Sequence, residues 1–234
     1  MSNEGINILA KIFKKEEYVE DFLGGNLYMN CLGFFKKVEA NSSKQFDSKE
    51  AIKSYLQPHG VKLELKFNDT SIFLTEDNLT APLMIQHSIF NNLKIICFYT
   101  FFFNFNDFNQ SIEELKISQE IVNDFGNDII LITDTKEFIN RVKNAINKSN
   151  QIIRHEGRKV DYFPASFHGD FSDNDVPFKK HEDFKYQQEF RIVLETVEHD
   201  DKPFTLQVGD IRDICRRFTV EEFNRVEIKL EHTD

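Results

Sequence analysis

The sequence predicts an α+β protein with a single domain over residues 1–234, in which mixed, mostly antiparallel sheets carry flanking helices. Three observations lead to this prediction. Many apolar segments show the period-two alternation of strands. The fewer segments with helical spacing do not alternate regularly with the strands, as they would in a doubly wound sheet. We also find no internal repeat and no interdomain linker.

The N-terminal part is predicted to begin with a strand, a helix and a second strand. In the first helix Tyr18, Val19 and Phe22 recur at helical spacing, and Gly24-Gly25 ends it. The predicted strands cover residues 6–13 and 26–30, and the predicted helices cover residues 14–23, 33–39 and 48–55.

The rest of the chain is predicted to be richer in strands. The aromatic run 95–103 is long enough for a central strand that is covered on both faces. The polar stretch 165–176 is expected to form a surface or active-site loop. Further strands are predicted over residues 61–67, 71–74, 83–85, 129–133, 160–163, 189–194, 204–208 and 226–230, helices over 111–122 and 135–148, and a short helical or turn segment over 211–218.

Composition narrows the function classes. A net charge of −10 and a pI near 5.2 argue against a general nucleic-acid-binding surface, although a local basic groove is compatible with both. No apolar run has transmembrane length, and we see no signal peptide. The three cysteines are isolated, which suits a reducing compartment, and neither they nor the seven histidines show metal-ligand spacing. We therefore expect a cytoplasmic protein with no membrane contact and no metal.

The stretch 185–194 is the most informative part of the sequence. Its apolar alternation begins at Phe190, so Gln187, Glu189 and Arg191 are predicted to share the opposite face. An amide, an acid and a guanidinium would then lie side by side at a strand edge. Such an array could hold a polar ligand and leave one carboxylate for chemistry. The alternative is a solvated strand face with a Glu/Arg pair.

The order of these motifs resembles the ADP-ribosyltransferase fold. The matching segments are a first strand, a helix that ends in Gly, a strand with an aromatic residue, and much later a Glu that opens a strand. In that family the first strand carries a His or Arg that grips NAD, and the next strand frames the nicotinamide. The Gln-x-Glu form also occurs in members that modify guanine in nucleic acid. The layout resembles, in addition, a broad group of uncharacterised bacterial proteins often encoded in defence loci. The segments are residues 8–13, 18–25, 27–30 and 187–193.

This resemblance implies NAD as the substrate and gives each matching residue a role. Glu189 would accept a hydrogen bond from the ribose 2′-hydroxyl and stabilise the positive charge that develops on the sugar. Gln187 would orient the nucleophile, and Tyr28 would stack on the nicotinamide ring. Arg191 would keep Glu189 ionised or contact a phosphate. Lys11 is the only cation of the first strand, where the family has His or Arg, and it could bind a ribose or phosphate as a point charge.

The resemblance thus implies an NAD-dependent mono-ADP-ribosyltransferase that acts on a macromolecule, with RNA or DNA favoured over protein. It would be a bacterial toxin or an anti-phage defence enzyme, and a neutralising antitoxin partner would be expected. Two alternatives stay open. One is a non-enzymatic interaction module that kept the fold and lost NAD binding. The other is a nuclease-like enzyme that uses Glu189 with Asp173 or Asp175. Residue by residue, Tyr28 could instead be a core aromatic and Lys11 a solvent-facing lysine.

Overall fold

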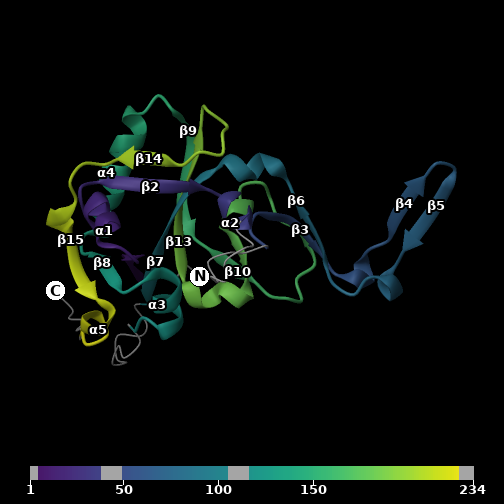
Figure 1. Cartoon of the computed structure of the whole chain (residues 1–234), viewed down its shortest axis with the longest axis horizontal. Coiled ribbons are helices and arrows are strands. Elements are labelled where there is room, and N and C mark those ends of the chain that lie inside the picture. Colours follow the sequence, from purple (N-terminus) through teal and green to yellow (C-terminus); the bar gives the residue numbers. More distant parts are fainter. Residues whose placement is uncertain (1–4, 38–48, 105–115, 227–234) are drawn as a thin grey trace.

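The computed structural model describes residues 5–37, 49–104 and 116–226, and it confirms the predicted fold class. Strands dominate, and every described strand pair is antiparallel except β10 with β12 (Figure 1). The helices are α1 Glu16–Leu23, α2 Phe34–Lys37, α3 Gln119–Phe125, α4 Thr135–Lys148 and α5 Val220–Phe223. The strands are β1 Gly5–Phe13, β2 Asn26–Cys31, β3 Ile52–Leu56, β4 Leu63–Phe67, β5 Thr70–Leu74, β6 Leu83–Gln86, β7 Lys94–Asn104, β8 Asp128–Ile132, β9 Ile152–Lys159, β10 Asp161–Phe163, β11 Gly169–Asp170, β12 Lys179–His181, β13 Glu189–Thr196, β14 Phe204–Gln207 and β15 Cys215–Thr219.

The main sheet is built around β7 and is split along one side of that strand. On the other side β7 pairs with β13, which in turn pairs with β9. On the split side β1 pairs with the C-terminal part of β7, from Tyr99 onward, whereas β2 pairs only with Lys94 and Ile95. The described registers leave residues 96–98 of β7 without a strand partner on that side. Because β1 and β2 diverge there, space opens between them.

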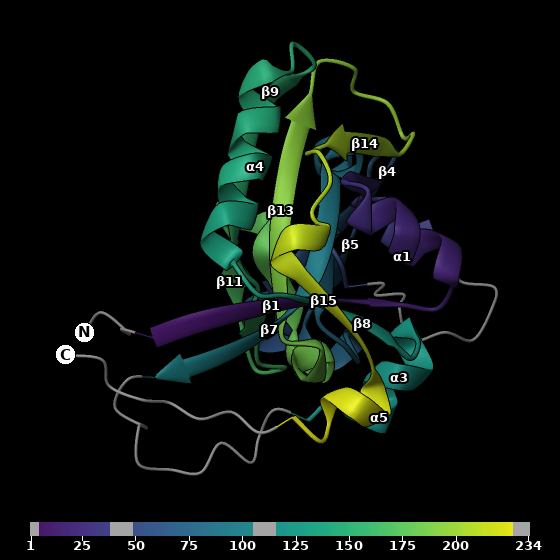
Figure 2. The same cartoon turned by 90° about the vertical axis from the view of Figure 1, so that its left-hand side faces the viewer.

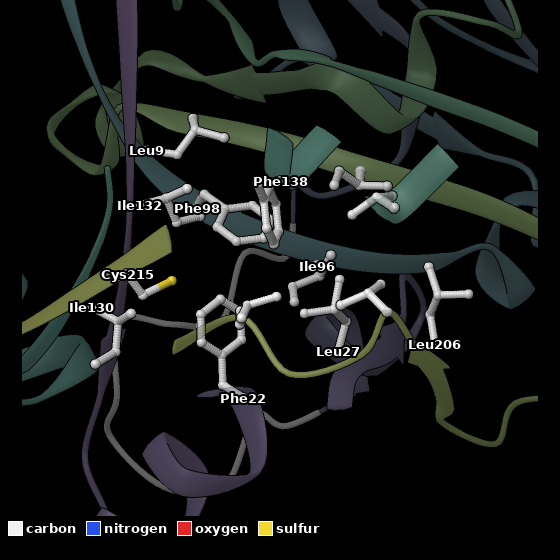
Figure 3. Packing of buried hydrophobic residues seen from close by; sticks show 14 of the residues in the cluster. Leu9, Phe22, Leu27, Ile96, Phe98, Ile130, Ile132, Phe138, Leu206 and Cys215 are labelled. Carbon is white, nitrogen blue, oxygen red and sulfur yellow. The ribbon is translucent and has the colours of Figure 1, made fainter. Parts of the chain in front are cut away.

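The largest core packs α1 and α4 on one face of this sheet (Figures 2 and 3). The helix α4 forms because Asp134 caps its N-terminus, accepting a hydrogen bond from the backbone N–H of Glu137 at 2.8 Å, and because Phe138, Val142 and Ile146 fall on one side. These three side chains are buried, and full burial of each stabilises the fold by roughly 1.5–3 kcal/mol. The aromatic centre of the cluster joins Phe98 to a helical phenylalanine from each side, Phe22 and Phe138.

A two-stranded hairpin extends away from the rest of the chain at one end of the long axis (Figure 1). It consists of β4 and β5, and we call residues 63–74 the hairpin arm. Before the arm, at the end of β3, Gln57 is held by its Nε2, which donates hydrogen bonds to the carbonyl oxygens of Ala165 and Phe167 at 2.7 and 2.9 Å. Both strands of the arm agree with the predictions from alternation.

One predicted element is wrong and a second is only half right. The helix expected over residues 48–55 is a turn followed by β3, because β3 gains partners in β6 and β11 that local spacing cannot reveal. Ala51 also has a φ of 55°, which ends any right-handed helix at that position. In the segment 211–218, Arg212–Ile214 forms the predicted turn, whereas residues 215–218 belong to the strand β15, which pairs with β8.

Three further strands were not predicted from the sequence, and one of them, the two-residue β11, lies in the stretch 165–176 that was expected to be a loop. The strand β9 is largely charged and exposed, so it has no apolar alternation, and it exists through its pairing with β13. The strand β12 has only three residues. The predicted helix 111–122 lies partly outside the described residues, as does the predicted strand 226–230. In the described part of the former, residues 119–122 form the first turn of α3.

Replacing Gly25 with alanine should destabilise the fold. Gly25 has a φ of +88°, and an added Cβ would lie 1.9 Å from the carbonyl oxygen of Gly209, so both the backbone and the neighbouring loop would have to move. We expect a loss of at least about 2 kcal/mol in the free energy of unfolding, measured by urea denaturation. Gly24→Ala is the control, since Gly24 has a φ of −69° and should tolerate a methyl group within about 1 kcal/mol. Equal effects of the two substitutions would contradict this account.

Candidate functional site

The split in the main sheet opens into a cavity of about 360 Å³. Its walls come from β1, α1, β2, α2, β7, α3 and β13, and Lys180 is added from β12. Glu50 comes from the turn before β3, and Gln187 from the turn before β13. All five residues singled out from the sequence line this cavity: Lys11, Tyr28, Gln187, Glu189 and Arg191. The fold therefore brings together residues that are up to 180 positions apart, from Lys11 to Arg191. This cavity is the candidate functional site.

Glu189 lies on the floor of the cavity and is 6% exposed. Its Oε1 accepts a hydrogen bond from Lys180 Nζ at 2.5 Å, and its Oε2 accepts one from Arg191 Nε at 2.8 Å. The expectation of a strand edge is wrong, because β13 lies between β7 and β9. The alternative of a solvated Glu/Arg pair is also wrong, since both side chains are buried.

The charges around Glu189 keep its carboxylate ionised. Burial by itself would raise the pKa of Glu189, but the positive charges of Arg191 and Lys180 and their hydrogen bonds outweigh burial and hold the pKa well below its usual range. The same pairing raises the pKa of Lys180, against the effect of burial. The sequence-based expectation that Arg191 would keep Glu189 ionised agrees with this geometry.

Arg191 is itself held by a second carboxylate. Its Nη1 and Nη2 donate to the two oxygens of Glu50 at 2.7 and 3.0 Å, and Nη1 also donates to the carbonyl oxygen of Pro177 at 2.8 Å. With the bond to Glu189, four of the five N–H groups of the guanidinium have partners. Arg191 is therefore placed to orient Glu189, and little of it is left for the phosphate contact considered above.

Gln187 belongs to the same hydrogen-bond network, although it does not lie on the strand that the alternation predicted. It ends a 3₁₀ turn over Glu182–Gln187, and Gln188, with a φ of 41°, separates it from β13. Its Oε1 nevertheless accepts from Lys180 Nζ at 2.6 Å, beside Glu189. Its Nε2 donates to the hydroxyl of Tyr186 at 3.2 Å. Both ends of the amide are thus engaged, and Gln187 is 3% exposed.

Lys11 reaches into the split between the strands. Its Nζ donates to the carbonyl oxygen of Cys97 at 2.7 Å, where β7 lacks a strand partner. Phe13 and Phe98 lie with their ring centroids 6.0 Å from this ammonium. Burial lowers the pKa of Lys11, although Cys97 and Glu189 oppose the shift. Lys11 is thus a partly buried lysine that lines the cavity, and its interpretation as a solvent-facing residue is wrong.

Two tyrosines stand at the entrance of the cavity. Tyr28 from β2 is 58% exposed and Tyr18 from α1 is 49% exposed, and both line the cavity. The interpretation of Tyr28 as a core aromatic is therefore wrong. Further inside, apolar side chains such as Ile121 and Phe125 complete the wall. The cavity combines an aromatic entrance with a charged, hydrogen-bonded floor, as small-molecule sites commonly do.

The sequence did not reveal two residues that line the cavity, Glu50 and Lys180, or Tyr162, which does not line it but contacts Glu189. Glu50 lies in a segment predicted to be helical, and Lys180 lies in a segment without any motif. Tyr162 accepts a hydrogen bond from the backbone N–H of Glu189 at 2.9 Å through its hydroxyl. No pattern in the sequence connects these residues to Glu189, because only the tertiary fold brings them within reach of it.

The acidic residues invoked for a nuclease-like enzyme lie elsewhere. Asp173 pairs with Lys53 at 2.5 Å, and Asp175 pairs with Arg158 at 2.6 Å. Neither is among the residues that line the cavity with Glu189. Across the described ranges 5–37, 49–104 and 116–226, no group of three His, Cys, Asp or Glu side chains could hold a metal ion. In the same part of the chain, no helix combines the length and the apolar character needed to cross a membrane.

No family model, curated protein or solved structure matches this chain. The cavity and its residues are therefore the basis on which we infer a function.

Replacing Glu189 with glutamine should destabilise the protein in a pH-dependent way. The variant leaves Lys180 and Arg191 without their carboxylate, which costs about 3–5 kcal/mol at pH 7. Because the folded pKa of Glu189 is depressed, its contribution is complete above the unfolded pKa of about 4.3 and is lost as the pH falls toward the folded pKa. The difference in the free energy of unfolding between wild type and variant, measured by urea denaturation, should therefore become smaller below about pH 4.3.

Glu195→Gln is the matched control on the same strand. Glu195 pairs with Arg154 at 3.1 Å, and both side chains are in contact with solvent, so the loss of this ion pair should cost less than about 1 kcal/mol. If the stability difference between wild type and Glu189→Gln stayed constant from pH 7 to pH 3, the neighbouring cations would not be lowering the pKa of Glu189.

Proposed function

We propose that this protein is an NAD-dependent ADP-ribosyltransferase whose site is the cavity in the split sheet. The observation that carries the proposal is the convergence of Lys11, Tyr28, Gln187, Glu189 and Arg191 on that cavity, with Glu189 held as an anion at its floor. A buried carboxylate that stays charged next to a cavity is the group required where positive charge develops on a sugar.

Glu189 keeps acceptor capacity for a substrate. An ionised carboxylate offers about four lone-pair sites. In the described structure Lys180 and Arg191 each occupy one, through different oxygens. Glu189 would use a remaining site to accept a hydrogen bond from the ribose 2′-hydroxyl. The bond from the ribose carbon to the nicotinamide nitrogen would break, and nicotinamide would leave with the electron pair. The acceptor atom would form the new bond to that carbon and lose its proton.

The size and lining of the cavity fit the nicotinamide riboside part of NAD. Its volume of about 360 Å³ lies at the lower end of the range for small-molecule sites, which is about 300–1,000 Å³. The remaining part of NAD would extend past the entrance, where Tyr18 and Tyr28 offer exposed rings for stacking. A macromolecular acceptor would approach from the same open side. The Gln-x-Glu form favours nucleic acid over protein, and a toxin or anti-phage defence role with an antitoxin partner belongs to the same proposal.

One alternative function has specific support. Both oxygens of Glu189 already bind cations, and the ammonium of Lys11 already donates to a backbone carbonyl. In a module that kept the fold and lost NAD binding, these contacts would serve only to hold the fold together. The two candidates differ in a direct way, because only the transferase consumes NAD.

The deciding experiment incubates the purified protein with labelled NAD and a mixture of RNA, DNA and protein from cells. We expect transfer of label by wild type and by Glu195→Gln, and loss of at least about 100-fold with Glu189→Gln, since the group opposite the developing charge is gone. The class of polymer that carries the label identifies the target. Folded wild-type protein that neither transfers label nor consumes NAD would overturn the proposal in favour of the interaction module.

Tyr28 provides a variant that leaves the buried network intact. Tyr28→Ala removes an exposed ring, so the fold should be retained, and we expect KM for NAD to rise about 10-fold through lost stacking while Tyr28→Phe stays close to wild type. The measurement is the initial rate of NAD consumption as a function of NAD concentration. Equal KM values for Tyr28→Ala and Tyr28→Phe would show that the ring does not contact NAD.

A further inference from the structure

A second cavity, of about 470 Å³, lies beside the start of β13. Thr100 of β7, Lys159 at the end of β9 and Tyr162 of β10 contribute to its wall. The 3₁₀ turn before β13 adds Lys185 and Tyr186. The volume of this cavity falls within the range of about 300–1,000 Å³ that is usual for small-molecule sites. We call it the second cavity.

The second cavity is distinct from the candidate functional site, although Glu189 lines both. Glu189 pairs with Tyr99, so the next residue of β7, Thr100, points to the opposite face of the sheet. Lys159 pairs with Phe190, the residue after Glu189, and therefore shares the face of Thr100. The side chains of Thr100 and Lys159 thus point away from the carboxylate of Glu189.

The charge of the second cavity is opposite to that of the whole chain, which carries −10. Lys159 and Lys185 bring two ammonium groups to its wall. Glu189 is the only acid among its described lining residues, and its carboxylate already binds Lys180 and Arg191. Within residues 5–37, 49–104 and 116–226, no hydrogen bond or ion pair occupies the ammonium of Lys185. A cationic cavity on an acidic protein attracts anions locally.

The other polar groups of the wall are hydroxyl groups. The hydroxyl of Tyr162 accepts from the backbone N–H of Glu189 at 2.9 Å, which leaves its proton for another acceptor. Burial and the charge of Glu189 raise the pKa of Tyr162, so this hydroxyl stays protonated. Thr100 is 5% exposed, and its Oγ1 has no hydrogen-bond partner in the described part of the chain. A buried hydroxyl group without a partner is uncommon and calls for an explanation.

Two tyrosine rings complete the wall. The hydroxyl of Tyr186 donates to Asp124 at 2.6 Å, so the ring is the part of Tyr186 that remains for a ligand. Tyr162 contributes a second ring, which is only partly buried. Aromatic side chains beside lysines are the combination with which proteins hold a base and its phosphate.

We propose that the second cavity binds a nucleotide through its phosphate and its base. Two ammonium groups with neutral hydroxyl donors beside them match the oxygens of a phosphate, which lysine contacts as a point charge. The rings of Tyr162 and Tyr186 match a base, because every base offers a flat face for stacking. An inorganic anion alone would leave most of the volume empty and both rings uncovered. The nucleotide is either free or one unit of a nucleic-acid strand, and the two sources share this chemistry.

The test is isothermal titration calorimetry of the full chain, without NAD, against 5′-AMP and against a single-stranded oligoadenylate. We expect wild type to bind AMP with a dissociation constant on the order of 10⁻⁵ to 10⁻³ M. Lys185→Gln should weaken binding about 10-fold, because one charge-assisted contact to the phosphate is lost. Lys66→Gln is the matched control, since it removes the same charge from an exposed lysine of the hairpin arm and should bind like wild type.

The two probes separate the two sources. Binding of the oligoadenylate at least about 10-fold more tightly than AMP identifies a strand as the ligand, and equal or weaker binding identifies the free nucleotide. No binding of either probe at millimolar concentration would overturn the proposal, as would equal affinities of wild type and Lys185→Gln. Equal weakening by Lys66→Gln would overturn it too, because overall charge would then explain the effect.

The fold of the variant and the outcome of the NAD experiment are checked separately. Lys185 is exposed, so Lys185→Gln should fold, and unchanged thermal unfolding verifies this. The proposal does not depend on the proposed transferase. AMP binding without NAD consumption, or NAD consumption without AMP binding, would show which of the two proposals fails.

Discussion

The buried guanidinium of Arg191 is the contact around which the site is organised. It joins Glu50, from the segment before β3, to Glu189 on β13, and it is 1% exposed. Lys180 completes a group of two acids and two bases that are balanced in charge. Such a buried group contributes little net stability compared with apolar residues of the same volume, because removing its charges from water is costly. Its presence next to a cavity therefore indicates a functional role more than a structural one.

The cavity exists because two strands share one side of β7 without meeting. The register places β1 against its C-terminal part and β2 against its first residues. The unpaired backbone between them would be exposed to the cavity, and Lys11 satisfies one of its carbonyls at Cys97. Burial raises the pKa of the Cys97 thiol to about 12. The thiol therefore stays protonated at neutral pH and offers no thiolate as a nucleophile. In the proposed reaction, the carboxylate of Glu189 is therefore the group on which the chemistry depends.

The sequence predicted the elements that carry their own periodicity and missed those that depend on distant partners. The helix α4 was predicted with correct bounds because its cap and its apolar side are local. The strand β9 was missed because its support comes from β13. For the site, alternation and motif order led to Glu189, Gln187, Arg191, Tyr28 and Lys11, and all five line the cavity. Glu50 and Lys180 could not be found in this way, since a charge in a loop or short strand reveals its burial only in the folded chain.

Strained backbone positions also indicate that the fold enforces the placement of Glu50 and Glu189. Three described residues other than glycine have a positive φ. One of them, Asn68, turns the hairpin arm and needs no further reason, because asparagine tolerates this conformation. The other two are Ala51 and Gln188, which lie next to Glu50 and Glu189. A left-handed residue of these types costs about 1–3 kcal/mol and persists only where its surroundings enforce it. Glu50 and Glu189 thus each lie beside a residue whose backbone adopts a conformation that its residue type disfavours. This is expected of side chains whose placement matters for function.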